Sequence, residues 1–69
     1  MLARMALLRV TRSLEGQNEE IILNTAHIVV AFPDRNNPAR GSFVQMVTGT
    51  PILVKMTFDE LWQLIQRET

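Results

Sequence analysis

The segment Thr57–Ile65, TFDELWQLI, constrains the fold most, because it is the clearest helical stretch of the chain. Thr57 and Glu60 have the spacing of a capping box, in which each side chain bonds the backbone N–H of the other residue. The residues that follow the spacing of one apolar helix face are Phe58, Leu61, Trp62 and Ile65. A helix this short does not persist alone. We therefore expect it to dock on the rest of the chain and to bury Phe58 and Trp62, although Trp62 also has the alternative of anchoring a partner.

The residues before this helix are typical of short strands separated by turns. The predicted strands are residues 5–12, 20–24, 28–32, 42–49 and 52–56. Gly16 lies in a tight hairpin turn between the first two, and Asn24 or Thr25 caps one helical turn before the third. The pattern predicts a mainly β (α+β) fold, a five-stranded antiparallel meander or small open barrel with one C-terminal helix.

The size and charge of the chain limit what it can do. With 69 residues we expect one small domain over residues 1–69, and seven basic against seven acidic side chains leave no net field to attract nucleic acid or anionic lipid. No apolar run reaches the roughly 18–20 residues that span a bilayer. The chain has no cysteine, which fits a reducing compartment. We therefore expect a cytoplasmic protein without membrane insertion.

The residue types needed for catalysis are scarce. His27 is the only histidine, and we expect it to be partly buried with a ring nitrogen bonded to a neighbouring carbonyl. Ser13 and Ser42 lack a histidine and acid pattern, and the three glycines are isolated at turns. The sequence thus predicts no enzyme, no catalytic residue, no cofactor and no metal site.

Two surfaces are candidates for binding. The fourth strand is apolar on both faces, with Phe43 and Val47 opposite Val44 and Met46, which is typical of a barrel wall or an interface. Open strand edges, and Met1, Leu2 and Met5 before the first strand, also favour pairing with a second copy. The other surface is the loop at residues 33–41, where Arg35 and Arg40, joined by Arg4, could contact phosphates or base edges. Arg9 and Arg12 are expected to pair with Glu19 and Glu20 across the first hairpin.

Most of the chain resembles the short bacterial flagellar and swarming-motility proteins of the FlbD type. The resemblance lies in LLRVTRSLEGQNEEIILNTAHIVVAF and SFVQMVTGTPILVKMTFDELWQLI, at Leu8 to Arg12, Gly16, Leu23-Asn24, Ile28, Thr48-Gly49, Val54-Lys55, Glu60, Leu61 and Ile65. This chain departs from that pattern in an N-terminal extension, a longer loop at residues 33–41 and Thr57 at the helix start. The resemblance implies a small non-enzymatic cytoplasmic accessory protein that contacts another protein, such as one of the flagellar motor, and it assigns no functional residues.

Two functions follow from these observations. The leading one is a protein-interaction module that self-associates, so that a charged residue in place of Phe43 or Val47 weakens assembly without unfolding the chain. The alternative is a nucleic-acid-binding or transcription accessory protein that uses the arginines of the loop at 34–40.

Overall fold

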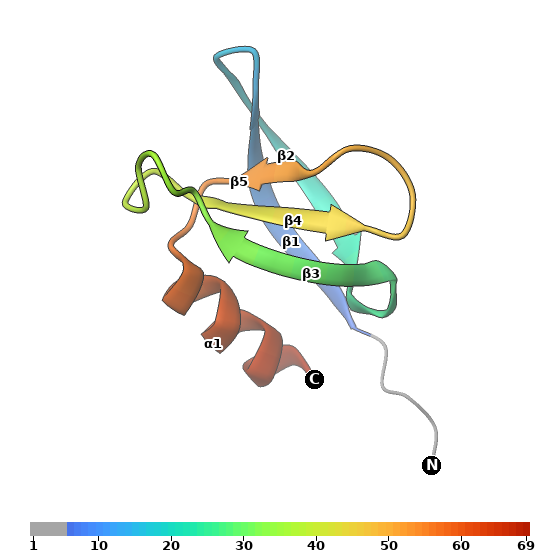
Figure 1. The fold of residues 1–69 in the computed structure, drawn as a ribbon. Helices are drawn as coiled ribbons and strands as arrows, with labels where there is room; N and C mark the ends of the chain where they lie inside the picture. The colour runs from blue at the N-terminus through green and yellow to red at the C-terminus, as the bar shows by residue number, and fades with distance from the viewer. Residues whose placement is uncertain (1–5) are drawn as a thin grey trace.

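The computed structural model describes residues 6–69 and contains five strands followed by one α-helix (Figure 1). The elements are β1 (Leu7–Leu14), β2 (Gln17–Asn24), the 3₁₀ turn η1 (Thr25–His27), β3 (Ile28–Pro33), β4 (Ser42–Met46), β5 (Ile52–Val54) and α1 (Phe58–Glu68). All paired strands are antiparallel and form one open sheet. The predicted fold class is confirmed.

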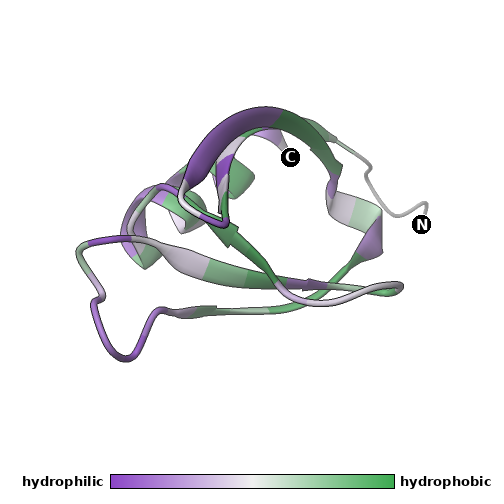
Figure 2. Ribbon diagram, turned by 90° about the horizontal axis from the view of Figure 1, so that it is seen from above, coloured by the Kyte–Doolittle hydropathy of each residue, from purple (hydrophilic) through white to green (hydrophobic). Residues whose placement is uncertain are grey.

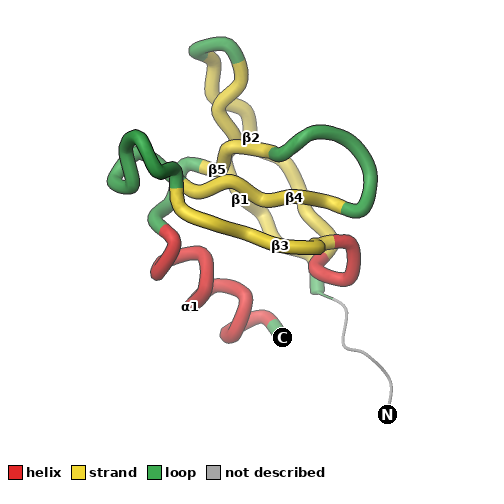
Figure 3. Tube along the Cα trace, viewed as in Figure 1, coloured by secondary structure: helices red, strands yellow, loops and turns green. Residues whose placement is uncertain are grey.

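The strand order in the sheet is β2-β1-β5-β4-β3. Strand β5 therefore lies between β1 and β4, where Val54 pairs with both Arg12 and Ser42. Strands β2 and β3 follow each other in the chain but form the two edges of the sheet (Figure 3). Each edge strand has a row of backbone groups without a sheet partner.

The β1–β2 hairpin has the register that its apolar and charged residues predict. Leu8 lies opposite Leu23 in the core, while Arg9 makes a two-bond contact with Glu20 at 3.0 and 2.9 Å. Arg12 pairs with Glu19 at 2.6 Å. The expected pairing of these arginines with the two glutamates is confirmed, while the buried Nε of Arg12 has no hydrogen-bond partner among the described residues.

Several strand boundaries differ from those predicted. Because Glu15 and Gly16 alone make the hairpin turn, with φ angles of 52° and 81°, β1 continues to Leu14 and β2 begins at Gln17. The predicted start of the first strand at Met5 lies outside the described residues. Strand β4 ends at Met46, before the bend at 47–50, and β5 ends at Val54. Compared with the prediction, β1 and β2 therefore pair over a longer stretch, whereas β4 and β5 are shorter.

The turn η1 begins as expected but its histidine does not behave as expected. The side chain of Asn24 accepts a hydrogen bond from the N–H of Ala26 at 2.9 Å and caps the turn. His27 is exposed and not partly buried, because the turn crosses the rim of the sheet, where its side chain meets solvent. Its carbonyl accepts from the N–H of Val47 at 2.8 Å, which ties η1 to the end of β4.

The core lies between the sheet and α1. Its buried apolar residues are Leu8, Val10, Leu23, Val44, Val54 and Leu61. In the view from above, apolar segments of the strands and helix face one another while the loop at 34–41 is hydrophilic (Figure 2). Helix α1 lies along the β3 side of the sheet (Figure 1).

The prediction that the helix buries Phe58 and Trp62 is wrong. Leu61 is the buried residue of α1, whereas Trp62 is 54% exposed and Phe58 is 41% exposed. The sheet is too small to cover the whole apolar face of α1. It buries Leu61, and the half-buried Leu64 and Ile65 pack beside Leu61. An exposed aromatic edge remains on the helix.

The predicted capping box of α1 is confirmed. Thr57 Oγ1 accepts from the N–H of Glu60 at 3.2 Å, and the N–H of Thr57 donates to Glu60 Oε1 at 2.8 Å. The backbone N–H of Thr57, and then its hydroxyl, hold the pKa of the Glu60 carboxyl below its ordinary value.

Glu60→Gln is expected to remove a pH-dependent part of the stability. Because the folded pKa of Glu60 lies below the unfolded value of about 4.3, its contribution is present above that pH and is lost as the pH falls through the folded pKa. Urea midpoints of the parent and variant should therefore differ at pH 7 and converge as the pH is lowered through the folded pKa of Glu60. A difference of equal size at every pH would contradict this role for the ionised carboxylate.

Candidate interaction surface

An apolar groove lies between edge strand β3 and α1. It has a volume of about 250 Å³, and its lining residues are Ile28, Ala31, Phe58, Leu61, Trp62 and Ile65. The first two belong to β3 and the other four to α1. No charged or polar side chain lines it. We call this feature the β3–α1 groove.

The local sequence explains why a hollow forms there. Helical spacing places Phe58, Trp62 and Ile65 on the side of α1 that faces β3, with Leu61 at the base and 1% exposed. Opposite them β3 has Ala31, whose small side chain leaves room that a larger residue would fill. The groove is therefore a gap between a broad helix face and a small residue on the sheet.

Strand β3 also has exposed apolar side chains outside the groove, and Val30, which pairs with Gln45, lies on the face of the sheet opposite Ala31. The register of β3 with β4 shifts between Ile28 and Val30, so an extra residue stands in β3 at this point. Val29 is 61% exposed and Val30 is 50% exposed. Strand β3 has no charged residue along Ile28–Pro33, whereas the opposite edge, β2, has Glu19 and Glu20. The two edges of the sheet thus differ in chemistry.

The predicted interface residues Phe43 and Val47 have different surroundings in the structure. Phe43 is half-buried and stacks on Phe32 of the neighbouring strand, with ring centroids 5.7 Å apart. Val44 beside it is fully buried, so alternation along β4 places Phe43 on the face turned away from the core. Val47 follows β4 and is 57% exposed. A charge at Phe43 would therefore also remove a contact within the sheet, while Val47 is free of that complication.

The two predicted loop arginines are not equivalent. Arg40 Nε lies 3.2 Å from Asp34 Oδ2, and the Asp34 side chain is only 6% exposed. The other carboxylate oxygen accepts from the N–H of Asn36 at 3.1 Å, so Asp34 organises the loop as well as pairing with Arg40. Arg35 is exposed and has no ion pair with a described residue. Arg4 lies outside the described residues.

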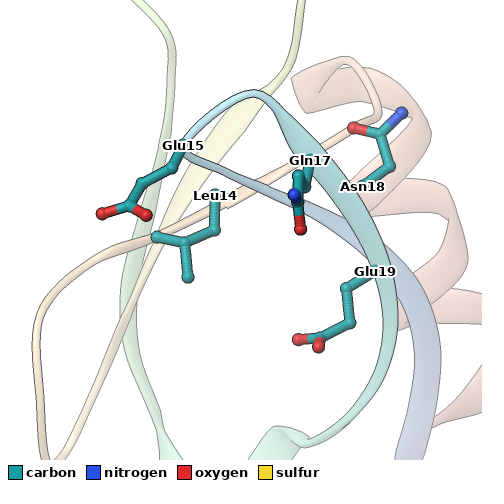
Figure 4. Close-up of a pocket in the computed structure, with 5 residues that line it drawn as sticks. All are labelled: Leu14, Glu15, Gln17, Asn18 and Glu19. Carbon is teal, nitrogen blue, oxygen red and sulfur yellow. The ribbon is translucent and has the colours of Figure 1, made fainter.

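A second hollow lies at the tip of the β1–β2 hairpin and is polar (Figure 4). Its lining residues are Leu14, Glu15, Gln17, Asn18 and Glu19. Across residues 6–69 no three His, Asp or Glu side chains gather as metal ligands would.

The width of the apolar face of α1 can be read from the sequence. The helix face is broad, because Leu64 adjoins the four residues at helical spacing, and a small sheet cannot cover all of it. That excess of apolar positions was the signal for the groove.

Within the part of the chain that the structure describes, no helix has the length and apolarity to cross a membrane.

The groove, the β3 edge and the loop arginines are thus known only from this chain's own residues and geometry. No family model, curated protein or solved structure matches the chain.

Proposed function

We propose that the protein is a small non-enzymatic interaction module that self-associates through edge strand β3 and the β3–α1 groove. The observation that carries this proposal is Trp62, which is 54% exposed at a groove lined by apolar side chains. Tryptophan beside an apolar hollow is typical of the residues that dominate binding energy at protein interfaces. The resemblance to motility proteins adds an accessory role in bacterial motility to the same proposal.

The chemistry of the groove favours a protein partner over a small molecule. Its volume of about 250 Å³ lies below the roughly 300–1,000 Å³ of typical small-molecule sites. It also lacks the few polar groups that orient such ligands. An uncharged edge strand beside it offers backbone hydrogen bonds to another chain. A protein surface can offer apolar side chains to the groove and backbone groups to the edge of β3 at the same time.

A nucleic-acid role for the loop at 34–40 has weaker support. Arg35 is exposed and available for a phosphate, but Arg40 is held by Asp34, and Arg9 and Arg12 are held by glutamates. The chain has no net charge to add long-range attraction. This alternative therefore depends on one unpaired loop arginine.

Light scattering over a concentration and salt series tests the proposed function. We expect the mass to rise above the 7.9 kDa of one chain as concentration increases, with little change between about 50 and 500 mM salt, because an apolar contact is not screened. The same samples should show no nucleic-acid absorbance. A single 7.9 kDa species at every concentration would contradict self-association. Copurified nucleic acid that high salt removes would favour the loop arginines instead.

A further inference from the structure

We propose that residues 1–5 of the same chain occupy the β3–α1 groove of a single molecule and must leave it before a second copy can bind there. This segment, with the sequence MLARM, precedes the residues that the structure describes. The inference rests on the proposed function and adds a regulatory step to it, because the chain's own segment then competes with a partner for the groove.

The described chain begins beside one end of the groove. Ala6 is fixed next to η1, because its N–H donates to Thr25 Oγ1 and its carbonyl accepts from the N–H of Thr25, both at 2.9 Å. Ile28, which lines the groove, follows η1 directly. The segment before Ala6 therefore starts close to this lining residue.

The groove extends away from this point along α1. The start of α1 lies near the far end of β3, because the last residue of β3 pairs with Ser42, whose hydroxyl donates to the carbonyl of Met56 at 3.0 Å. The helix then runs back along β3, which brings Ile65 to the same groove as Ile28. A segment that leaves Ala6 toward α1 thus enters the groove at its Ile28 end.

The length of the segment matches the length of the groove. From Phe58 to Ile65 the helix rises about 10 Å, at about 1.5 Å per residue. Five extended residues span at most about 17 Å. Residues 1–5 can therefore reach from the start of β1 to the Phe58 end of the groove without any change in the described strands.

The side chains of the segment suit a hollow without polar lining. In an extended chain, alternate side chains face one side, so Met1 and Met5 share a face while Arg4 faces the opposite way. Methionine fills irregular apolar hollows, and its sulfur makes favourable contacts with aromatic rings. Phe58 and Trp62 supply two such rings in the groove.

The small exposed area favours an attached segment over a separate protein. Aromatic side chains bury about 150–250 Å² each, so the exposed fractions of Trp62 and Phe58, 54% and 41%, represent on the order of 200 Å². A stable interface between separate proteins buries roughly 800 Å² on each side, so a second copy must add the edge of β3 to this contact. A segment attached at Ala6 is present at an effective concentration of about millimolar, and a weak contact is enough to hold it.

Methyl NMR on the full chain tests the contact directly. With isotope-labelled methionine methyl groups, we expect nuclear Overhauser effects between Met1 or Met5 and the indole of Trp62, the only tryptophan. The sample is kept at a concentration where light scattering gives 7.9 kDa, the mass of one chain. Leucine substitutions at Met5, Met46 and Met56 assign three of the four methionine signals, and the remaining signal belongs to Met1.

Met5→Asp should release the segment, because burial of an unpaired carboxylate in an apolar groove is costly. At the same low concentration, we expect the Trp62 emission to move to longer wavelength and its quenching by acrylamide to increase. The dissociation constant of the pair should fall, about 10-fold if the segment closes about nine grooves in ten. Arg4→Asp is the matched control, since it introduces the same side chain on the face turned away from the groove, and it should behave like the parent.

Two results would overturn the contact within the chain and leave self-association to its own test. One is the absence of Overhauser effects from Met1 and Met5 to Trp62 in the dilute parent. The other is Trp62 emission that is unchanged in a folded Met5→Asp variant, or that changes equally in Arg4→Asp. A sample that mixes labelled and unlabelled chains adds a third result, because effects seen only between chains would place the segment in a second copy.

The proposed function can fail separately. If the parent and Met5→Asp both keep the mass of one chain at every concentration, self-association and the regulatory step are overturned. The Overhauser effects then decide alone whether the segment occupies the groove. If Met5→Asp releases Trp62 but associates no more tightly than the parent, the segment does not compete with a second copy, and the regulatory step is overturned while self-association stands.

Discussion

Gly41→Ala is expected to unfold the protein. A Cβ atom at this position would lie 2.2 Å from the carbonyl oxygen of Val54 and 3.3 Å from Cδ1 of Leu53. The first of these neighbours is backbone in a fully buried residue that pairs with strands on both sides. It cannot move without displacing the centre of the sheet. Overpacking typically costs about 1–3 kcal/mol and more where backbone must shift, while a domain this small has a margin of only about 3–5 kcal/mol.

Circular dichroism and thermal unfolding measure this effect, and Gly16→Ala is the matched control. Gly16 has a φ of +81° but no heavy atom within 4 Å of an added Cβ. Its substitution should therefore cost only the left-handed strain, about 1–2 kcal/mol, and lower the Tm by roughly 4–8 °C for each kcal/mol. If the Gly41 variant folds with a Tm equal to that of the Gly16 variant, the close approach to β5 is wrong.

Leu61→Ala is expected to be the most damaging truncation in α1, although Trp62 beside it is larger. Leu61 is 1% exposed in the core, so its truncation leaves a cavity and should lower the free energy of unfolding by about 2–5 kcal/mol. Trp62→Ala should cost only about 1–2 kcal/mol, because half of the side chain already meets water. Urea unfolding at low protein concentration gives both values without a contribution from association.

Leu64→Ala provides an intermediate control, since Leu64 is half-buried against the core. The expected order of destabilisation is Leu61, then Leu64, then Trp62. A Trp62→Ala variant as unstable as Leu61→Ala would show that the indole belongs to the core and would remove the basis for the groove as an interface.

The elements of this fold that depend on neighbouring residues were predictable from the sequence. The capping box of Thr57 and Glu60 and the Asn24 cap involve residues close in sequence. The charge pairs of the first hairpin join residues that are directly opposite, Arg12 and Glu19, or diagonal, Arg9 and Glu20. The fold class followed from these local patterns because one short helix and several strands have few ways to bury their apolar faces.

The parts that depend on how distant elements meet were not predictable in the same way. How much of the helix face the sheet covers is set by tertiary packing, so Trp62 was wrongly assigned to the core. The exposure of His27 depends on where η1 lies relative to the sheet. The pairing of Arg40 with Asp34 depends on how the loop at 34–41 folds back. The groove combines β3 and α1, which are far apart in sequence, and no single segment contains its pattern.

The order of strands in the sheet has a consequence for how large an assembly can become. One edge, β2, carries Glu19 and Glu20 and is occupied by ion pairs with β1, while the other, β3, is uncharged. Growth into a fibre needs two different binding edges on every copy, so that each added chain leaves an edge available for the next chain. A chain with only one such edge has no free binding edge after it has bound its first partner. Association through β3 would therefore stop at a pair, and the charged side chains along β2 would disfavour pairing at that edge.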